Sequence, residues 1–257
     1  GRISHPDLQP GGILPVAPSA LRPAGQVFTG QEMKDFVTPR ALETGEIPGL
    51  IANYVQAARA AMEAGFDGVE VHAGNGYLLD QFLRSSTNQR SDAYGGSKEN
   101  RARLLLEVLD AVCTAIGNDR VGLRLSPVSP FNDIADDDPQ STFDYVVTQL
   151  NPLRLAFLDV LQGTGGAPRE EWIPFDYEPL RALYSGNLIR NNGYDFATAQ
   201  QAVASGAADA IAFGRLLLAN PDLVERFRRG APLNAPDYER LYTGEEKGYT
   251  DYPFLAG

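Results

Sequence analysis

The sequence has 257 residues, of which 43% are hydrophobic and 21% are charged, as in an ordinary globular protein. Its formal net charge of −11 disfavours binding to nucleic acids or anionic membranes, and no hydrophobic run approaches the roughly 18 residues that a membrane helix requires. The single cysteine, Cys113, excludes an internal disulfide, and two histidines, His5 and His72, are too few for a multi-histidine metal site. We therefore expect a cytoplasmic protein without a metal centre, whose partners are neither nucleic acids nor membranes.

The first part of the sequence has little regular pattern. Residues 1–46 are rich in proline and glycine, and Val27-Phe28 and Phe36-Val37 are the only short strand candidates. Loops of this length usually have a function. We interpret residues 3–46 as an excursion, or lid, over the domain that follows. Glycine stands first and no targeting pattern follows it, so we expect the sequence to begin inside a longer polypeptide.

From Ile47 onwards, helical and strand patterns alternate. Hydrophobic residues at helical spacing predict a helix that begins at Ile47 and is ended by Gly65, and a strand is predicted directly after it at 67–72. The same criteria predict further helices at 104–116, 142–150, 177–184, 196–205 and 221–228, and further strands at 121–126, 156–161, 187–191 and 209–213. Five strands that alternate with helices favour an α/β fold with one parallel sheet, and we expect 1–257 to be a single domain.

The end of the first predicted strand carries three polar side chains within six residues. His72 ends the strand on one of its faces, and Asn75 would point to the other face unless the chain turned at Ala73-Gly74, where glycine tolerates the necessary backbone angles. Parallel α/β folds keep their chemistry at this end of a strand. Two side-chain donors and the phenol of Tyr77 are the groups that polarise a carbonyl compound and protonate it.

Arg124 is the second unusual residue, because it lies on the inward face of the predicted strand at 121–126. An inward arginine is costly unless an anion or a hydrogen-bond acceptor meets it. An inward glutamate such as Glu70, on the same face as His72, would satisfy it, and so would a bound ligand. The sequence leaves both alternatives open.

Two glycine turns follow the last two predicted strands, at 191–195 and 213–215. Consecutive turns of this kind expose backbone N–H groups, and barrels bind phosphate with such turns after strands seven and eight. Arg215 accompanies the second turn and would add a positive charge.

Four aspartates cluster between prolines in another part of the sequence, and we expect them to form a solvated loop. They are Asp133, Asp136, Asp137 and Asp138.

One long block and several shorter motifs together carry a family resemblance. The block is HAGNGYLLDQFLRSSTNQRSDAYGGSKENRARLLLEV at 72–108, and the motifs are GRISHPDLQPGG, PRALETGEIPG, the Arg124 strand, NNGYD, AFGRLLLANPDL and YTGEEKGYTDYP. Over essentially the whole chain, this sequence resembles the old yellow enzyme family of FMN-dependent ene-reductases. The resemblance implies a TIM (β/α)8 barrel, of which these residues would form strands four to eight and the end of strand three. It also implies FMN at the carboxyl ends of the strands, NADPH or NADH as the reductant and an electron-poor alkene as the substrate.

The resemblance also implies a role for individual residues. His72 and Asn75 match the pair that hydrogen-bonds the carbonyl oxygen of the substrate, and Tyr77 matches the proton donor to its α-carbon. Arg124 matches a contact to the flavin ring, and Tyr242 matches an aromatic residue that borders the substrate. The residues that match the phosphate end of FMN are Gly193, Tyr194, Gly214 and Arg215.

Two other functions remain as alternatives. A family member without the first barrel strands would be weakly active or inactive unless a complementary N-terminal segment or chain supplied them. A phosphate-binding barrel enzyme of another class, such as an aldolase or isomerase, would share the glycine turns. Lys34, Lys98 and Lys247 are the only lysines, and none stands at the end of a predicted barrel strand, so Schiff-base chemistry has no evident nucleophile.

Overall fold

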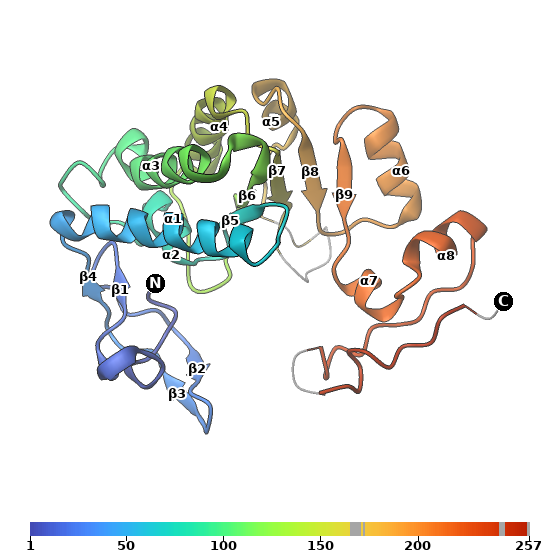
Figure 1. Cartoon of the computed structure of the whole chain (residues 1–257), viewed down its shortest axis with the longest axis horizontal. Helices are drawn as coiled ribbons and strands as arrows, with labels where there is room; N and C mark the ends of the chain where they lie inside the picture. The colour runs from blue at the N-terminus through green and yellow to red at the C-terminus, as the bar shows by residue number, and fades with distance from the viewer. Residues whose placement is uncertain (165–170, 172, 242–244, 256–257) are drawn as a thin grey trace.

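A parallel β-sheet forms the centre of the protein in the computed structural model, which describes residues 1–164, 171, 173–241 and 245–255. Within these residues the sheet has five strands in the order β5-β6-β7-β8-β9, so each strand pairs with its neighbours along the chain (Figure 1). The strands are β5 (Val69–Ala73), β6 (Val121–Leu125), β7 (Phe157–Leu161), β8 (Leu188–Asn191) and β9 (Ala210–Ala212). All five lie where the sequence predicts a strand, and the α/β class is confirmed.

Helices alternate with these strands, as predicted. The α-helices among the described residues are α1 (Ile47–Glu63), α2 (Leu78–Leu83), α3 (Lys98–Ile116), α4 (Pro139–Leu150), α5 (Glu178–Leu183), α6 (Phe196–Ala204), α7 (Arg215–Ala219) and α8 (Leu223–Arg229). Short 3-10 turns occur at Pro6–Leu8, Pro10–Gly12, Thr44–Glu46, Asn118–Arg120 and Asn151–Leu153. None of the helices in the described part of the chain is long and hydrophobic enough to cross a membrane.

Local signals begin and end the helices. Ser97 caps α3 by accepting a hydrogen bond from the backbone N–H of Asn100 at 3.4 Å, and Gly117 ends the helix with a φ of 94°. Helix α4 begins three residues before the predicted start, because Asp138 accepts a hydrogen bond from the N–H of Ser141 at 3.1 Å and Pro139 occupies the first turn.

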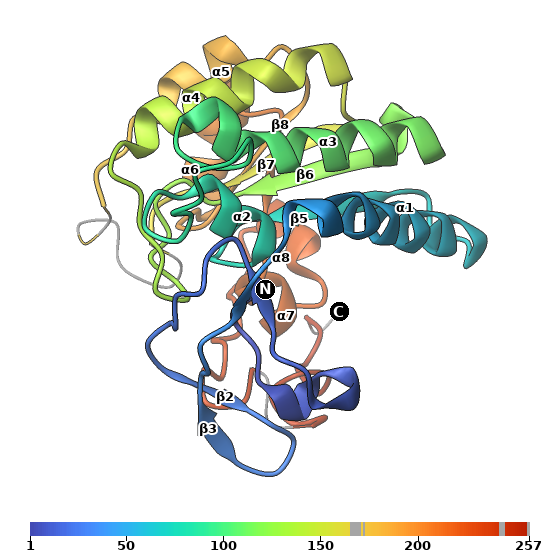
Figure 2. The same cartoon turned by 90° about the vertical axis from the view of Figure 1, so that its left-hand side faces the viewer.

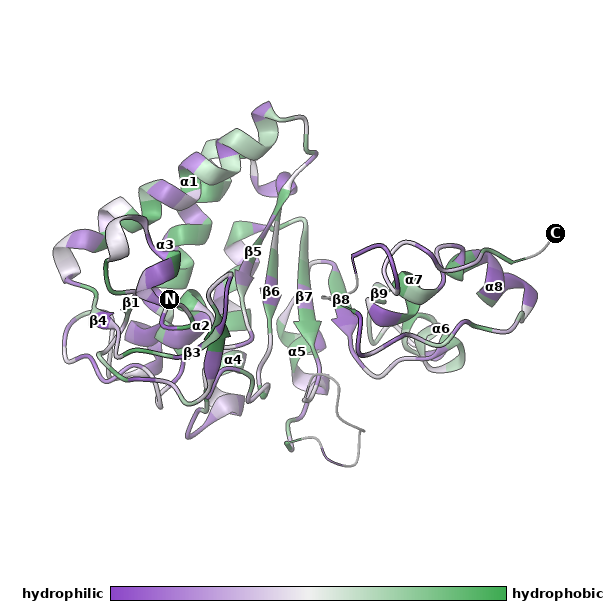
Figure 3. Ribbon diagram, turned by 90° about the horizontal axis from the view of Figure 1, so that it is seen from below, coloured by the Kyte–Doolittle hydropathy of each residue, from purple (hydrophilic) through white to green (hydrophobic). Residues whose placement is uncertain are grey.

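The hydrophobic core lies between the sheet and helices α1, α3 and α4. Alternation along each strand sends Val71, Leu123 and Leu158 into this core, and α1 and α3 run side by side over it (Figure 2). Hydrophobic and hydrophilic residues alternate visibly along β6 (Figure 3). On the opposite face of the sheet, Gly122 leaves room for the ring of its cross-strand neighbour Phe157, because a Cβ atom at Gly122 would lie 2.3 Å from that ring.

The segment before α1 lies on the side of the sheet at which the strands end (Figure 1). It contains the parallel pair β1 (Val16–Ala17) and β4 (Arg40–Ala41), and the antiparallel hairpin β2 (Gln26–Phe28) and β3 (Met33–Asp35). The prediction of a strand at Val27-Phe28 is confirmed. The prediction at Phe36-Val37 is wrong, because the hairpin pairs Phe28 with Met33, so its second strand ends at Asp35 and the buried Phe36 packs inwards.

The acidic segment before α4 is only partly a solvated loop. The side chain of Asp136 is fully buried, where it accepts hydrogen bonds from the N–H of Ser85 at 3.0 Å and the hydroxyl of Thr142 at 3.0 Å. Arg101 lies 3.5 Å from the same carboxylate. The prediction missed the contacts to Ser85 and Arg101 because these partners are distant in the sequence, and the carboxylate fastens this loop to α3 and to the segment that follows α2.

Candidate functional site

The turn after β5 differs in one detail from the prediction. The left-handed backbone lies at Asn75, with a φ of 56°, and at Gly76, with a φ of 73°, rather than at Ala73-Gly74. Asparagine tolerates this conformation better than most residues. Gly74 is required for another reason: a Cβ atom there would lie 2.9 Å from the hydroxyl oxygen of Ser126, so glycine allows β5 and β6 to approach at their ends.

Three neighbouring segments hold this turn in place. The backbone N–H of Asn75 donates to the hydroxyl of Ser126 at 2.6 Å, and the side-chain amide of Asn132 donates to the carbonyl of Asn75 at 2.7 Å. The N–H of Gly76 donates to the carboxylate of Asp80 at 2.9 Å. The backbone of Asn75 is therefore fixed, whereas its half-buried side-chain amide makes no hydrogen bond to the described residues.

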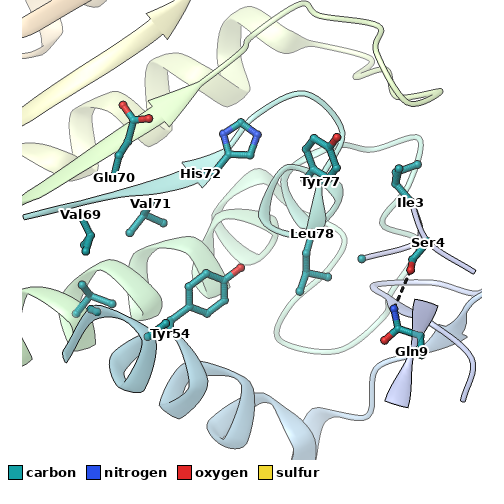
Figure 4. A pocket seen from close by; sticks show the side chains of 14 residues that line it. Ile3, Ser4, Gln9, Tyr54, Val69, Glu70, Val71, His72, Tyr77 and Leu78 are labelled. Carbon is teal, nitrogen blue, oxygen red and sulfur yellow. Dashed lines mark hydrogen bonds between the residues drawn. The ribbon is translucent and has the colours of Figure 1, made fainter. Parts of the chain in front are cut away.

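His72 and Tyr77 come together on either side of this turn. Their ring centroids are 5.5 Å apart, and both line a cavity of about 630 Å³ that also includes Glu70 and, across the edge of β5, Tyr54 (Figure 4). Glu70 and His72 project from one face of β5, as predicted (Figure 4). Asn75 and Arg124 do not line this cavity.

Electrostatics favour a neutral His72. Burial lowers the pKa of its imidazole, and the positive charge of Arg124 lowers it further, whereas Asp80 acts weakly in the opposite direction. At neutral pH the ring then carries one N–H donor and no charge. A neutral imidazole next to the exposed phenol of Tyr77 can still donate one hydrogen bond to an acceptor in the cavity.

Arg124 does meet an anion within the protein, and this anion is Asp159 and not Glu70. Its guanidinium forms an ion pair with Asp159, and its Nη2 donates to the side-chain oxygen of Asn191 at 2.9 Å. The alternative in which an inward glutamate such as Glu70 pairs with Arg124 is wrong, because the sheet register sets Arg124 beside Asp159 on β7. The same register sets Arg124 beside His72 on β5, so His72, Arg124 and Asp159 form one row across the sheet.

The carboxylates around Arg124 are perturbed by their surroundings. Burial raises the pKa of Asp159, although Arg124 partly offsets the effect. Partial desolvation and the negative charge of Asp159 raise the pKa of Glu70, and Arg124 again acts in the opposite direction. Perturbed ionisable groups that gather in one place, as these do on one face of the sheet, are a common feature of functional sites.

A second cavity, of about 420 Å³, lies at the ends of β8 and β9. The structure brings all four residues predicted at the phosphate end to this cavity, whose lining includes Gly193, Tyr194, Gly214, Arg215 and the unpredicted Tyr238. Arg215 is exposed and lies 5.8 Å from the ring of Tyr238, but it forms no ion pair with a carboxylate in the described part of the chain. A Cβ atom at Gly214 would meet no protein atom within 4 Å. The cavity can therefore accept a small anion.

The two asparagines beside this cavity are engaged in the protein itself. The amide of Asn191 donates to the carbonyl of Ala212 at 2.7 Å, and the amide of Asn192 donates to the carbonyl of Gln162 at 2.8 Å. These bonds join β8 to β9 and to the end of β7. Both polar side chains thereby act as cross-strand links that support the turn at Gly193.

Comparison with known proteins identifies the family. Residues 9–234 match the NADH:flavin oxidoreductase / NADH oxidase family. The chain belongs to this family. A probable flavin mononucleotide-dependent alkene reductase of Leishmania infantum is 48% identical to it over 99% of the chain and 70% of the relative. The 12-oxophytodienoate reductase 1 of Oryza sativa subsp. japonica is 44% identical over 99% of the chain and 67% of the relative.

Solved structures support the same assignment. Morphinone reductase in complex with tetrahydroNAD matches this flavin oxidoreductase with a TM-score of 0.92 and 47% identity, over 100% of this chain and 71% of the other. The old yellow enzyme homologue of Zymomonas mobilis matches with a TM-score of 0.93 and 43% identity, over 99% and 72%. The resemblance to the old yellow enzyme family is confirmed, and the fold is of the old yellow enzyme type.

Sequence reasoning about this flavin oxidoreductase missed Asp159, Ser126 and Tyr238. Asp159 was detectable, since a lone carboxylate in the hydrophobic strand Phe157–Leu161 is the same signal that drew attention to Arg124. The predicted substrate contact Tyr242 lies outside the described residues. Residues 3–46 lie on the side where the strands end, and their function as a lid stays a prediction.

Proposed function

We propose that this chain is an FMN-dependent ene-reductase that takes reducing equivalents from NADPH or NADH and reduces an α,β-unsaturated carbonyl compound or a related electron-poor alkene. The observation that carries this proposal is the meeting of His72 and Tyr77 around one cavity, on either side of the turn that holds Asn75. The alkene reductase named among the relatives supports the same reaction class.

The residues present fit FMN. The cavity at Gly193, Gly214 and Arg215 would hold the phosphate, because it is lined by two glycine turns, has open space at Gly214 and contains an arginine that makes no ion pair with a described carboxylate. Arg124 would contact the ring system from the middle of the sheet. When bound, FMN supplies the hydride-transfer chemistry between nicotinamide and alkene that amino-acid side chains do not provide.

The side chains at the turn would polarise and protonate the substrate. The neutral imidazole of His72 and the amide of Asn75 would donate hydrogen bonds to the carbonyl oxygen, on which negative charge accumulates during reduction. Preorganised donors of this kind typically contribute about 3–4 kcal/mol each to transition-state stabilisation. Tyr77 would deliver the proton to the α-carbon, since its phenol is a hydroxyl donor and its side chain is exposed towards the cavity.

We also propose that the five described strands correspond to strands four to eight of an eight-stranded barrel, with the first residues of the sequence at the end of strand three. On this interpretation the row formed by His72, Arg124 and Asp159 faces the barrel interior, and a complementary N-terminal segment or chain would complete the flavin site. This accounts for the exposure of Glu70, which projects from the same face.

An aldolase-type barrel enzyme is less consistent with the lysines. Lys34 pairs with Asp7 at 2.7 Å on the β2–β3 hairpin, and Lys98 donates to Ser141 at 2.6 Å at the start of α3. Lys247 lies in the C-terminal tail. No strand of the described sheet ends at a lysine, which leaves that reaction class without a nucleophile.

The test combines a spectrum with one matched pair of variants. Purified protein should show flavin absorbance as isolated or after addition of FMN, and it should oxidise NADPH in the presence of 2-cyclohexenone. Tyr77→Phe should lower alkene reduction by about 10²- to 10⁴-fold, the usual contribution of a general acid. Tyr249→Phe, a change at an exposed tyrosine outside both cavities, should leave the rate unchanged. Protein that neither carries nor gains flavin would refute the proposal.

A further inference from the structure

Asp159 is the most unusual group that the proposed reaction does not use. It is only 4% exposed, on a hydrophobic strand, and one of its carboxylate oxygens pairs with Arg124. The other oxygen, Oδ1, is buried and has no hydrogen-bond partner among the described residues. A buried carboxylate that is only half satisfied costs stability, so it calls for an explanation.

Asp159 is not the only group that holds the Arg124 side chain in place. Its Nη2 already donates to Asn191, whose own amide is fixed by the carbonyl of Ala212 at 2.7 Å. The guanidinium therefore has two partners, the charged carboxylate of Asp159 on β7 and the neutral amide oxygen of Asn191 on β8. What Asp159 adds, beyond position, is a negative charge next to the cation, which weakens the positive potential that Arg124 projects from the sheet.

We propose that Asp159 is a positioning residue that sets the reduction potential of the bound FMN by partly neutralising Arg124. The proposal rests on the proposed function, in which Arg124 contacts the flavin ring. A cation beside the ring favours the more negatively charged reduced form, and a carboxylate that pairs with this cation opposes the effect. Asp159 thereby lowers the potential and favours transfer from flavin to alkene over transfer from nicotinamide to flavin.

The other ionisable groups on this face act less directly. Glu70 and His72 both lie on β5, and the sheet register sets His72 beside Arg124, whereas Asp159 is the group in direct contact with the guanidinium. Glu70 is exposed, so water screens its charge. Among the described residues, Asp159 is thus the carboxylate that can tune Arg124 from a buried position.

The test changes the negative charge on either side of the Arg124 guanidinium, at Asp159 and at Asn191. The potential of bound FMN is measured at pH 8, because burial raises the pKa of Asp159 and the carboxylate must be ionised. Asp159→Asn should raise the potential by about 30 mV, which corresponds to a tenfold change in the equilibrium constant of a two-electron couple. Asn191→Asp, which adds a carboxylate on the other side of the guanidinium, should lower it by a similar amount, and the double variant should return it towards the wild-type value.

Controls separate this inference from the proposed function. Asp110→Asn removes one exposed charge on the outer helix α3 and should leave the potential unchanged. If Asp159→Asn fails to fold, the shift in Asn191→Asp still decides the question. Wild-type protein that binds FMN and reduces alkenes, with equal potentials in all variants, would overturn the inference and leave the proposed function intact. Wild-type protein that binds no FMN would overturn both.

Discussion

The ion pair between Asp80 and Arg84 supports the turn that carries Asn75, and its loss should be costly. Asp80 is fully buried and the side chain of Arg84 is 2% exposed, with 2.7 Å between the carboxylate and Nε. Asp80 also accepts the N–H of Gly76 at 2.9 Å. Asp80→Asn removes the negative charge and leaves the guanidinium with neutral partners, among them the carbonyl of Pro127 at 2.6 Å. Breaking one side of a buried pair costs about 3–5 kcal/mol, a large share of the stability of a typical domain.

Equilibrium unfolding in urea measures this loss, with FMN at the same concentration in every sample because a bound ligand adds to stability. The matched control is Glu225→Gln on α8, since Glu225 pairs with Arg229 at the same i,i+4 spacing on the surface. The control should change the free energy of unfolding by little more than the error of the measurement. If Asp80→Asn cost no more than the control, the reasoning from burial would be refuted.

Three further changes test the site. Burial and Arg124 lower the pKa of His72 from its ordinary 6.5, so the neutral ring contributes stability above that pH and the contribution is lost as the pH falls through the lower folded pKa. Urea unfolding between pH 8 and pH 5 should show wild type losing stability relative to His72→Gln, whereas parallel curves would contradict this. Ser126→Ala frees the N–H of Asn75 and should raise the KM for the alkene about tenfold, the equivalent of one hydrogen bond of roughly 1.4 kcal/mol. Arg215→Gln should weaken FMN binding at least tenfold in a fluorescence titration, and an unchanged dissociation constant would remove Arg215 from the phosphate site.

Local patterns in the sequence were sufficient for most of the elements. The helix that begins at Ile47 and stops before Gly65 follows from hydrophobic spacing and a glycine stop, both of which lie within a few residues of each other. The alternation in Val121–Leu125 likewise set Arg124 on the face opposite the hydrophobic core, which holds Val121, Leu123 and Leu125. The strand at Phe36-Val37 failed because the register of a hairpin depends on its partner strand as well as on its own residues.

The contacts that could not be predicted from the sequence are those between residues that lie far apart in it. Ser126 is 51 residues from Asn75, and Asp159 is 35 residues from Arg124. Predicting either contact requires knowledge of the register between neighbouring strands, and the pattern within a single strand does not determine this register. The turn was predicted two residues too early for a related reason, since Gly74 is needed for the approach of Ser126 and not for a left-handed backbone. Residue types could indicate the chemistry at this site, but the pairing of strands decides which groups touch.

The net negative charge of the chain is compatible with a cavity that binds an anion, because dissolved salt screens electrostatic interactions beyond a short distance. A net charge of −11 repels an approaching anion only weakly at physiological ionic strength, where the Debye length is about 8 Å. Some arginines on the outer helices are paired with carboxylates, such as Arg181 with Asp209 and Arg229 with Glu225. Arg215 instead faces a cavity lined by glycine turns and Tyr238, without a described carboxylate as an ion-pair partner. In the proposed function, a phosphate group would thus be bound by the local arrangement of Arg215 and the glycine turns, which does not require a basic protein.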